Sequence, residues 1–123
     1  LPSYLRASHV GLQILSNVPE FYYGTSPNKF FDYLSTGMPI VINYPGWLAE
    51  IVKENDLGLF VTPGDANALA DALMLLRGDA EALAAKGKRS RMVAEKKCDR
   101  LALADKWVDY VCGDLEGRDK ENA

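Results

Sequence analysis

Short apolar runs alternate with amphipathic segments along the first part of the chain. Each run is mostly apolar, which is typical of a strand buried on both faces of a sheet. The segments between them carry apolar residues at helical spacing, as the crossover helices of a parallel sheet do. The alternation therefore predicts an α/β protein with a parallel sheet and flanking helices. The predicted strands are residues 9–15, 39–43 and 57–61, and the predicted helices are residues 26–36, 46–55 and a segment capped by Asp65.

The strand count indicates how much of a domain is present. Three strands are half of the roughly six found in a doubly wound nucleotide-binding domain, so the chain is predicted to be the second half of such a domain. Two further amphipathic segments, 79–95 and 98–112, are expected to form C-terminal helices. The charged, glycine-containing residues 113–123 predict a flexible tail, which leaves residues 1–112 as the partial domain.

Candidate chemistry is concentrated in residues 22–41, YYGTSPNKFFDYLSTGMPIV. A turn formed by Gly24, Thr25, Ser26 and Pro27 leads into a helix, since Ser is a good N-cap and Pro fits the first helical position. A helix start at the carboxyl end of a parallel strand leaves free backbone N–H groups that favour an anion. The turn is therefore a predicted phosphate site.

The predicted helix has one polar and one apolar side at 100° per residue. A nucleotide diphosphate needs N–H groups and a cation at one end and a carboxylate for the ribose hydroxyls at the other, and the polar residues occur in that order. A surface helix with a solvated polar side explains the same periodicity, so both interpretations stand. Truncation of Phe31 is expected to open a core cavity. The polar side carries Asn28, Lys29 and Asp32, and the apolar side carries Phe30, Phe31 and Leu34.

Four ordered blocks in this region resemble a known family. The stretch SPNKFFDYLSTGMPIVINYPGWLAEIVKENDLGLFVTPGDANALADAL is similar to the C-terminal half of the GT-B-fold retaining glycosyltransferases of family-4 type, and the match spans about residues 1–78. The family has an acidic residue, a glycine-rich stretch and a second acidic residue before its x-Gly-x-Pro-Val-Val segment. The resemblance implies the second half of a GT-B C-terminal domain, with a Rossmann-like sheet that binds a nucleotide sugar.

The resemblance also implies roles for individual residues. Asp32 stands at the second acidic position, usually Glu, and is the implied acceptor of ribose hydroxyl hydrogen bonds. The first acidic position falls on Gly24, and PNKFFDY looks like a family variant, PSKxxEY, that lacks this residue. No catalytic residue of this chain and no metal or cofactor is implied. The implied donor-binding residues are Gly24, Thr25, Ser26, Pro27, Asn28, Lys29 and Asp32.

By the same resemblance, the full-length parent transfers a hexose from a nucleotide sugar, expected to be a UDP-sugar, to a saccharide or lipid-linked acceptor with retention. Such enzymes build lipopolysaccharide, capsule and other cell-surface polysaccharides. The parent is expected in the cytoplasm, with contact to the inner face of the membrane. The chain starts at Leu1, not Met, so it is expected to be a piece of something longer. The resemblance implies that the acceptor-binding N-terminal GT-B domain and the basic residues that clamp the diphosphate are missing, so this fragment is expected to be inactive alone.

Two other functional classes remain open. A nucleotide-sugar epimerase of the same fold would turn over its donor without an acceptor. A flavodoxin- or receiver-like binding module is the non-enzymatic alternative, but a receiver needs acidic residues at the end of its first strand, and residues 9–15 supply none.

Composition limits the partners. The formal net charge of −3 gives no electrostatic case for nucleic acid. Cys98 and Cys112 are interpreted as reduced thiols. Residues 9–15 would normally pair with a strand of the absent half-domain, which leaves an exposed sheet edge. Self-association through this edge is therefore expected.

Overall fold

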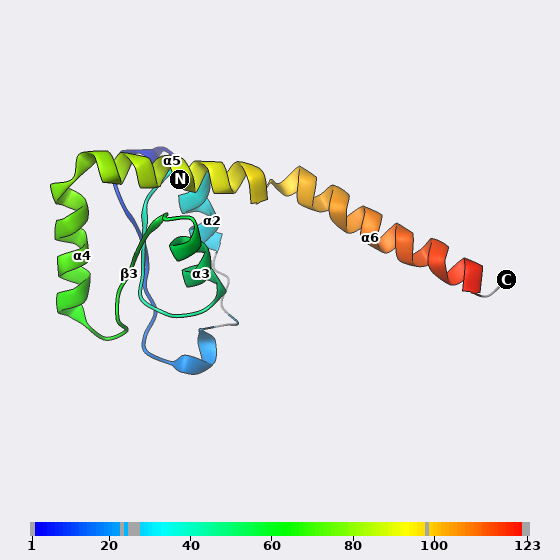
Figure 1. Cartoon of the computed structure of the whole chain (residues 1–123), viewed down its shortest axis with the longest axis horizontal. Coiled ribbons are helices and arrows are strands. Elements are labelled where there is room, and N and C mark those ends of the chain that lie inside the picture. Colours follow the sequence, from blue (N-terminus) through cyan, green and yellow to red (C-terminus); the bar gives the residue numbers. More distant parts are fainter. Residues whose placement is uncertain (1, 23, 25–27, 98, 122–123) are drawn as a thin grey trace.

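The computed structural model describes residues 2–22, 24, 28–97 and 99–121 (Figure 1). The strands and the helices around them form a small α/β body, and the long C-terminal helix extends away from this body. In chain order the elements are α1 (Pro2–Ala7), β1 (Gly11–Gln13), the 3-10 turn η1 (Pro19–Phe21), α2 (Asn28–Ser35), β2 (Ile40–Ile42), α3 (Trp47–Glu54), β3 (Gly58–Phe60), α4 (Ala66–Gly78), α5 (Ala80–Lys97) and α6 (Arg100–Glu121).

The three strands form one parallel sheet in the order β1-β2-β3, which confirms the α/β prediction. In the register, Leu12, Val41 and Leu59 lie side by side across the sheet. The ladder is limited to three residues per strand, so the strands are shorter than the apolar runs that predict them. A parallel sheet with helices between its strands is a Rossmann-like arrangement.

Both faces of β2 are buried. Side chains alternate along a strand, so Ile40 and Ile42 join a core with residues of α2, α3 and α5. Val41 points to the opposite face and packs with Ala72 and Leu76 of α4. This two-sided burial is why residues 39–43 read as a continuous apolar run rather than an alternating one.

Helix α5 crosses closely over the end of α2. A Cβ atom at Gly87 would lie 2.4 Å from the carbonyl oxygen of Gly37, so only glycine permits this approach. Arg91, one turn further along α5, donates a hydrogen bond to the carbonyl oxygen of Ser35 at the last residue of α2. The crossing fixes the C-terminal half of α5 beside α2.

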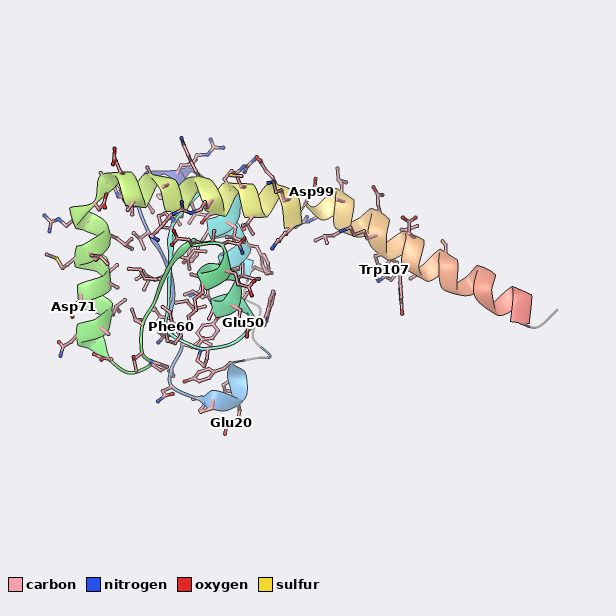
Figure 2. The ribbon with its side chains drawn as sticks, in the orientation of Figure 1. Glu20, Glu50, Phe60, Asp71, Asp99 and Trp107 are labelled. Atoms are coloured by element: carbon pink, nitrogen blue, oxygen red, sulfur yellow. The ribbon has the colours of Figure 1, made fainter. Side chains whose placement is uncertain are left out.

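Helix α6 runs to Glu121, beyond Cys112, where the predicted helix 98–112 ends. The expected tail is therefore helical through residue 121. Gly113 and Gly117 weaken a helix by only about 1 kcal/mol each, and the residues around them include good helix formers. Trp107 and Tyr110 are 67% and 71% exposed, so neither packs on the domain. Figure 2 shows Trp107 projecting from the helix.

Candidate functional site

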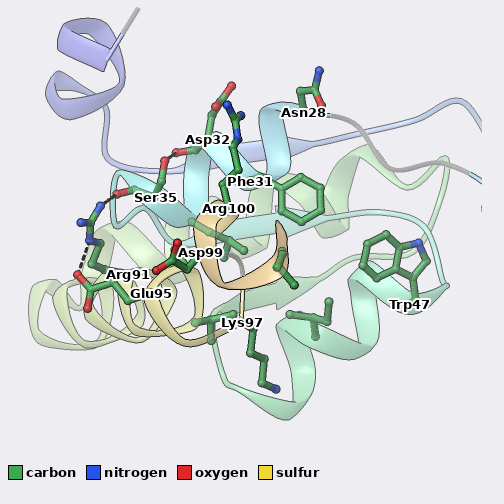
Figure 3. Close-up of a pocket in the computed structure, with 15 residues that line it drawn as sticks. Asn28, Phe31, Asp32, Ser35, Trp47, Arg91, Glu95, Lys97, Asp99 and Arg100 are labelled. Carbon is green, nitrogen blue, oxygen red and sulfur yellow. Dashed lines mark hydrogen bonds and ion pairs between the residues drawn. The ribbon is translucent and has the colours of Figure 1, made fainter. Parts of the chain in front are cut away.

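A cavity of about 1090 Å³ opens between α2, α3, the end of α5 and the start of α6 (Figure 3). Small-molecule sites typically measure roughly 300–1,000 Å³, so the volume is sufficient for a ligand of nucleotide-sugar size. Each wall comes from a different part of the chain, and the α5–α2 crossing holds the walls together. We therefore treat this cavity as the candidate site.

Helix α2 supplies the polar wall. Asn28, Asp32 and Ser35 follow one another at intervals of four and three residues, which places them on one face of a helix. The backbone carbonyl oxygen of Asp32 accepts a hydrogen bond of 2.8 Å from the Thr36 hydroxyl. Its carboxylate has no hydrogen-bond or ion-pair partner among the residues that the structure describes. It is therefore free to accept hydrogen bonds from a ligand.

An aromatic pair forms a second wall. The ring centroids of Phe31 and Trp47 lie 6.3 Å apart, and their planes are inclined by 38°. Trp47 begins α3 directly after Gly46, whose φ of 137° is a conformation that residues with a side chain rarely adopt. This turn brings the indole ring from the end of β2 to the cavity. The pair offers an apolar surface against which a flat ring can pack.

Basic residues complete the lining. Arg91 is already engaged, because its Nε atom lies 2.9 Å from the Glu95 carboxylate. Lys97 and Arg100 form no ion pair with any other described residue. In Figure 3 the Arg100 guanidinium and the Asp32 carboxylate point toward the same end of the cavity. Asp99 also lines the cavity, and its carboxylate accepts a hydrogen bond of 2.9 Å from the Leu101 N–H. The cavity thus combines the Asp32 carboxylate, aromatic rings and two basic side chains without an ion-pair partner among the described residues.

The structure places only some of the site residues predicted from the sequence in the cavity. Asn28 and Asp32 both line the cavity. Lys29 and Gly24 are exposed and are not among the lining residues. Lys29 points away from the cavity because it lies one position after Asn28, which is about 100° around the helix. The remaining predicted residues, Thr25, Ser26 and Pro27, lie outside the described residues.

The lining residues that sequence reasoning missed include Trp47, Lys97 and Arg100. The predicted helix 46–55 includes Trp47, but its periodicity does not show what its first turn faces. No local signal marks Lys97 or Arg100. They are distant from α2 in the sequence and reach the cavity only because α5 crosses over α2.

A buried polar network joins the carboxyl ends of β1 and β2. Asn43 exchanges two hydrogen bonds of 2.8 Å with the backbone of Leu15. The Gln13 amide donates to the Tyr44 hydroxyl over 2.9 Å, and both side chains are fully buried. Burial raises the pKa of Tyr44 above its ordinary value of 10.0, which the hydrogen bond from Gln13 partly offsets. The neutral hydroxyl is therefore the form that the fold favours.

This pKa shift predicts alkaline sensitivity. As the pH rises through about 10, the unfolded chain loses the Tyr44 proton while the folded chain retains it, so the free energy of unfolding falls. Tyr44→Phe should flatten that decline and cost about 1–3 kcal/mol at pH 7, because Gln13 loses its partner. Urea titrations at pH 7 and 10.5 measure both effects. Tyr4→Phe, at an exposed position, is the control, and an unchanged pH dependence in Tyr44→Phe would contradict the assignment.

No protein-family model, curated protein or solved structure matches this chain. Within the described ranges, His, Cys, Asp and Glu side chains form no group of three or more that could hold a metal ion. None of the described helices has the length and apolar character needed to cross a membrane.

Proposed function

We propose that this chain is the nucleotide-sugar-binding half-domain of a GT-B-fold retaining glycosyltransferase of family-4 type. The observation that carries the proposal is the unpaired Asp32 carboxylate in a cavity of about 1090 Å³ beside the Phe31–Trp47 pair. The Rossmann-like sheet and the sequence blocks around α2 support it. The proposed donor is a UDP-sugar, and the proposed acceptor is a saccharide or lipid-linked hydroxyl.

Each chemical group of the donor has a counterpart in the cavity. The Asp32 carboxylate accepts hydrogen bonds from the ribose hydroxyls, and the aromatic pair packs against the base. Asn28 stands at the first residue of α2, where unpaired backbone N–H groups favour the diphosphate. Asn28 and Asp32 are about 6 Å apart along the helix axis at the standard rise, a suitable spacing for adjacent groups of one nucleotide.

The chain's contribution to the reaction is to hold the donor and stabilise the departing diphosphate. Transfer breaks the bond between the anomeric carbon and the diphosphate, and the acceptor hydroxyl forms the new glycosidic bond with retention. Helix N-terminal N–H groups and the cations Lys97 and Arg100 offset the charge that develops on the leaving group. An N-terminal domain of the parent binds the acceptor, so the isolated chain is expected to bind donor without transferring sugar.

Asp32→Asn tests this assignment. A hydrogen bond to a charged group contributes about 1.5–3 kcal/mol, so the substitution should weaken UDP-sugar binding roughly ten- to a hundredfold. Because the Asp32 carboxylate has no partner among the described residues, the thermal unfolding midpoint should stay near that of the wild type. Calorimetric titration with UDP and a panel of UDP-sugars measures the affinities.

Asp71→Asn is the matched control, because Asp71 is an exposed carboxylate on α4, which packs on the opposite face of the sheet (Figure 2). It should bind the donor as the wild type does. Equal affinity of Asp32→Asn and the wild type would remove Asp32 from the donor site. Failure of the wild type to bind any nucleotide sugar would overturn the proposed function.

A further inference from the structure

Helix α6 presents large, exposed apolar side chains, of which Leu103 also lines the candidate cavity. Figure 1 shows it extending away from the body, and Figure 2 shows Trp107 projecting from it with no other element beside it. Burial of such side chains normally stabilises a helix, and a long isolated helix is only marginally stable in water. We call these residues the α6 apolar face: Leu101, Leu103, Trp107, Val108 and Tyr110, all between 48% and 77% exposed.

The α6 apolar face is continuous. At 100° per residue its members fall within an arc of roughly 200°, which Ala104 and Val111 fill, while Asp105, Lys106 and Asp109 occupy the rest. A surface helix of a globular protein usually has an apolar stripe of about 100° or somewhat more. The α6 apolar face is therefore wide enough to pack against another helix along residues 101–111.

Charge is distributed unevenly along residues 96–121, which include the end of α5 and the whole of α6. Residues 96–106, at its base, include four basic and two acidic residues, a net charge of +2. Residues 107–121, its outer part, include five acidic and two basic residues, a net charge of −3. The base of one copy is therefore complementary to the outer part of another, provided that the two helices run in opposite directions.

We propose that two copies of this chain associate through an antiparallel pair of α6 helices. Antiparallel pairing buries both α6 apolar faces and sets each basic base against the partner's acidic outer part. Parallel pairing would place the acidic parts together, where like charges repel. The acidic outer part also disfavours an anionic membrane surface as the occupant. The arrangement is self-complementary about a two-fold axis, as in most homodimers.

Sedimentation equilibrium across a range of protein concentrations and salt tests the pairing. The wild type should form a dimer, and raising the salt should weaken it, because screening reduces the attraction between base and outer part. Trp107→Glu places a charge at the centre of the contact and should raise the dissociation constant at least tenfold. Met74→Glu, an equally exposed apolar position on α4, is the matched control and should leave it unchanged.

Leu12→Glu separates this pairing from association through the β1 edge, where Leu12 is exposed. Dimers that survive Trp107→Glu but are lost in Leu12→Glu would overturn the proposal, as would a monomer at every concentration. Cosedimentation of wild type, but not Trp107→Glu, with vesicles of phosphatidylcholine and phosphatidylglycerol would instead assign the α6 apolar face to a membrane.

Cross-linking tests the direction of the pair. In a Cys98→Ser, Cys112→Ser background, one chain carries Arg100→Cys and the other Asp114→Cys, seven residues before and seven residues after Trp107 at the centre of the contact. Antiparallel helices place these thiols together, so oxidation of the mixture should yield mainly the mixed dimer. Predominant homodimeric cross-links would show parallel helices and contradict the proposal.

Discussion

Gly58→Ala is expected to prevent formation of the native sheet. A Cβ atom at Gly58 would lie 1.6 Å from the carbonyl oxygen of Ile40, and real Cβ atoms essentially never approach within 3.0 Å. The obstructing atom belongs to the backbone of the central strand, so no side-chain rotation relieves the overlap. β3 must move away from β2, and the hydrogen bonds from Ile40 to Leu57 and from Val61 to Ile42 are lost with it.

The expected cost is above the 1–3 kcal/mol usual for overpacking, because both strands have to shift. That is a large part of the roughly 5–15 kcal/mol that stabilises a typical domain. Urea denaturation followed by circular dichroism should show no cooperative transition, or one at a much lower midpoint. Gly78→Ala is the control, since a Cβ atom there has nothing within 4 Å. A Gly58→Ala midpoint near that of Gly78→Ala would contradict this account of the sheet.

Phe30→Ala is expected to destabilise the fold by about 3–5 kcal/mol, the range for deleting a buried aromatic ring. Phe30 is fully buried, packs in the core with Leu34 and Ile42, and meets the edge of Phe31 at a centroid distance of 5.5 Å. The close packing of α2, α3 and α5 around it leaves little room for the site to collapse. Chemical denaturation of the variant measures the loss.

The companion change Phe31→Ala should cost clearly less. Periodicity predicts a core position for Phe31, but the structure leaves this ring half-buried and lining the open cavity. Truncating it enlarges a space already open to water instead of creating a void in the core. Equal losses of stability in the two variants would mean that Phe31 is a core residue and that the cavity beside it is closed to water.

Local patterns predicted the elements of the body well. Periodicity located all three strands and the helices between them, and Asp65 caps α4 as expected by accepting a 2.9 Å hydrogen bond from the Ala68 N–H. These features depend on neighbours within a few residues, so the sequence encodes them directly. The adjacent positions 30 and 31 show the limit of this reasoning. Both lie on the apolar side of α2, yet only Phe30 is fully buried, because burial depends on which elements pack over each ring.

The sequence by itself determined a parallel α/β arrangement and a polar side of α2 that includes Asn28 and Asp32, because hydrophobic periodicity and turn chemistry act locally. The tertiary structure alone decided that these residues share a cavity with Trp47, Lys97 and Arg100. That meeting depends on the crossing of α5 over α2, which is a contact between residues far apart in the chain. The tertiary structure also decided that α6 leaves the body with its apolar face exposed, because amphipathicity predicts that a face needs a partner without saying where the partner lies.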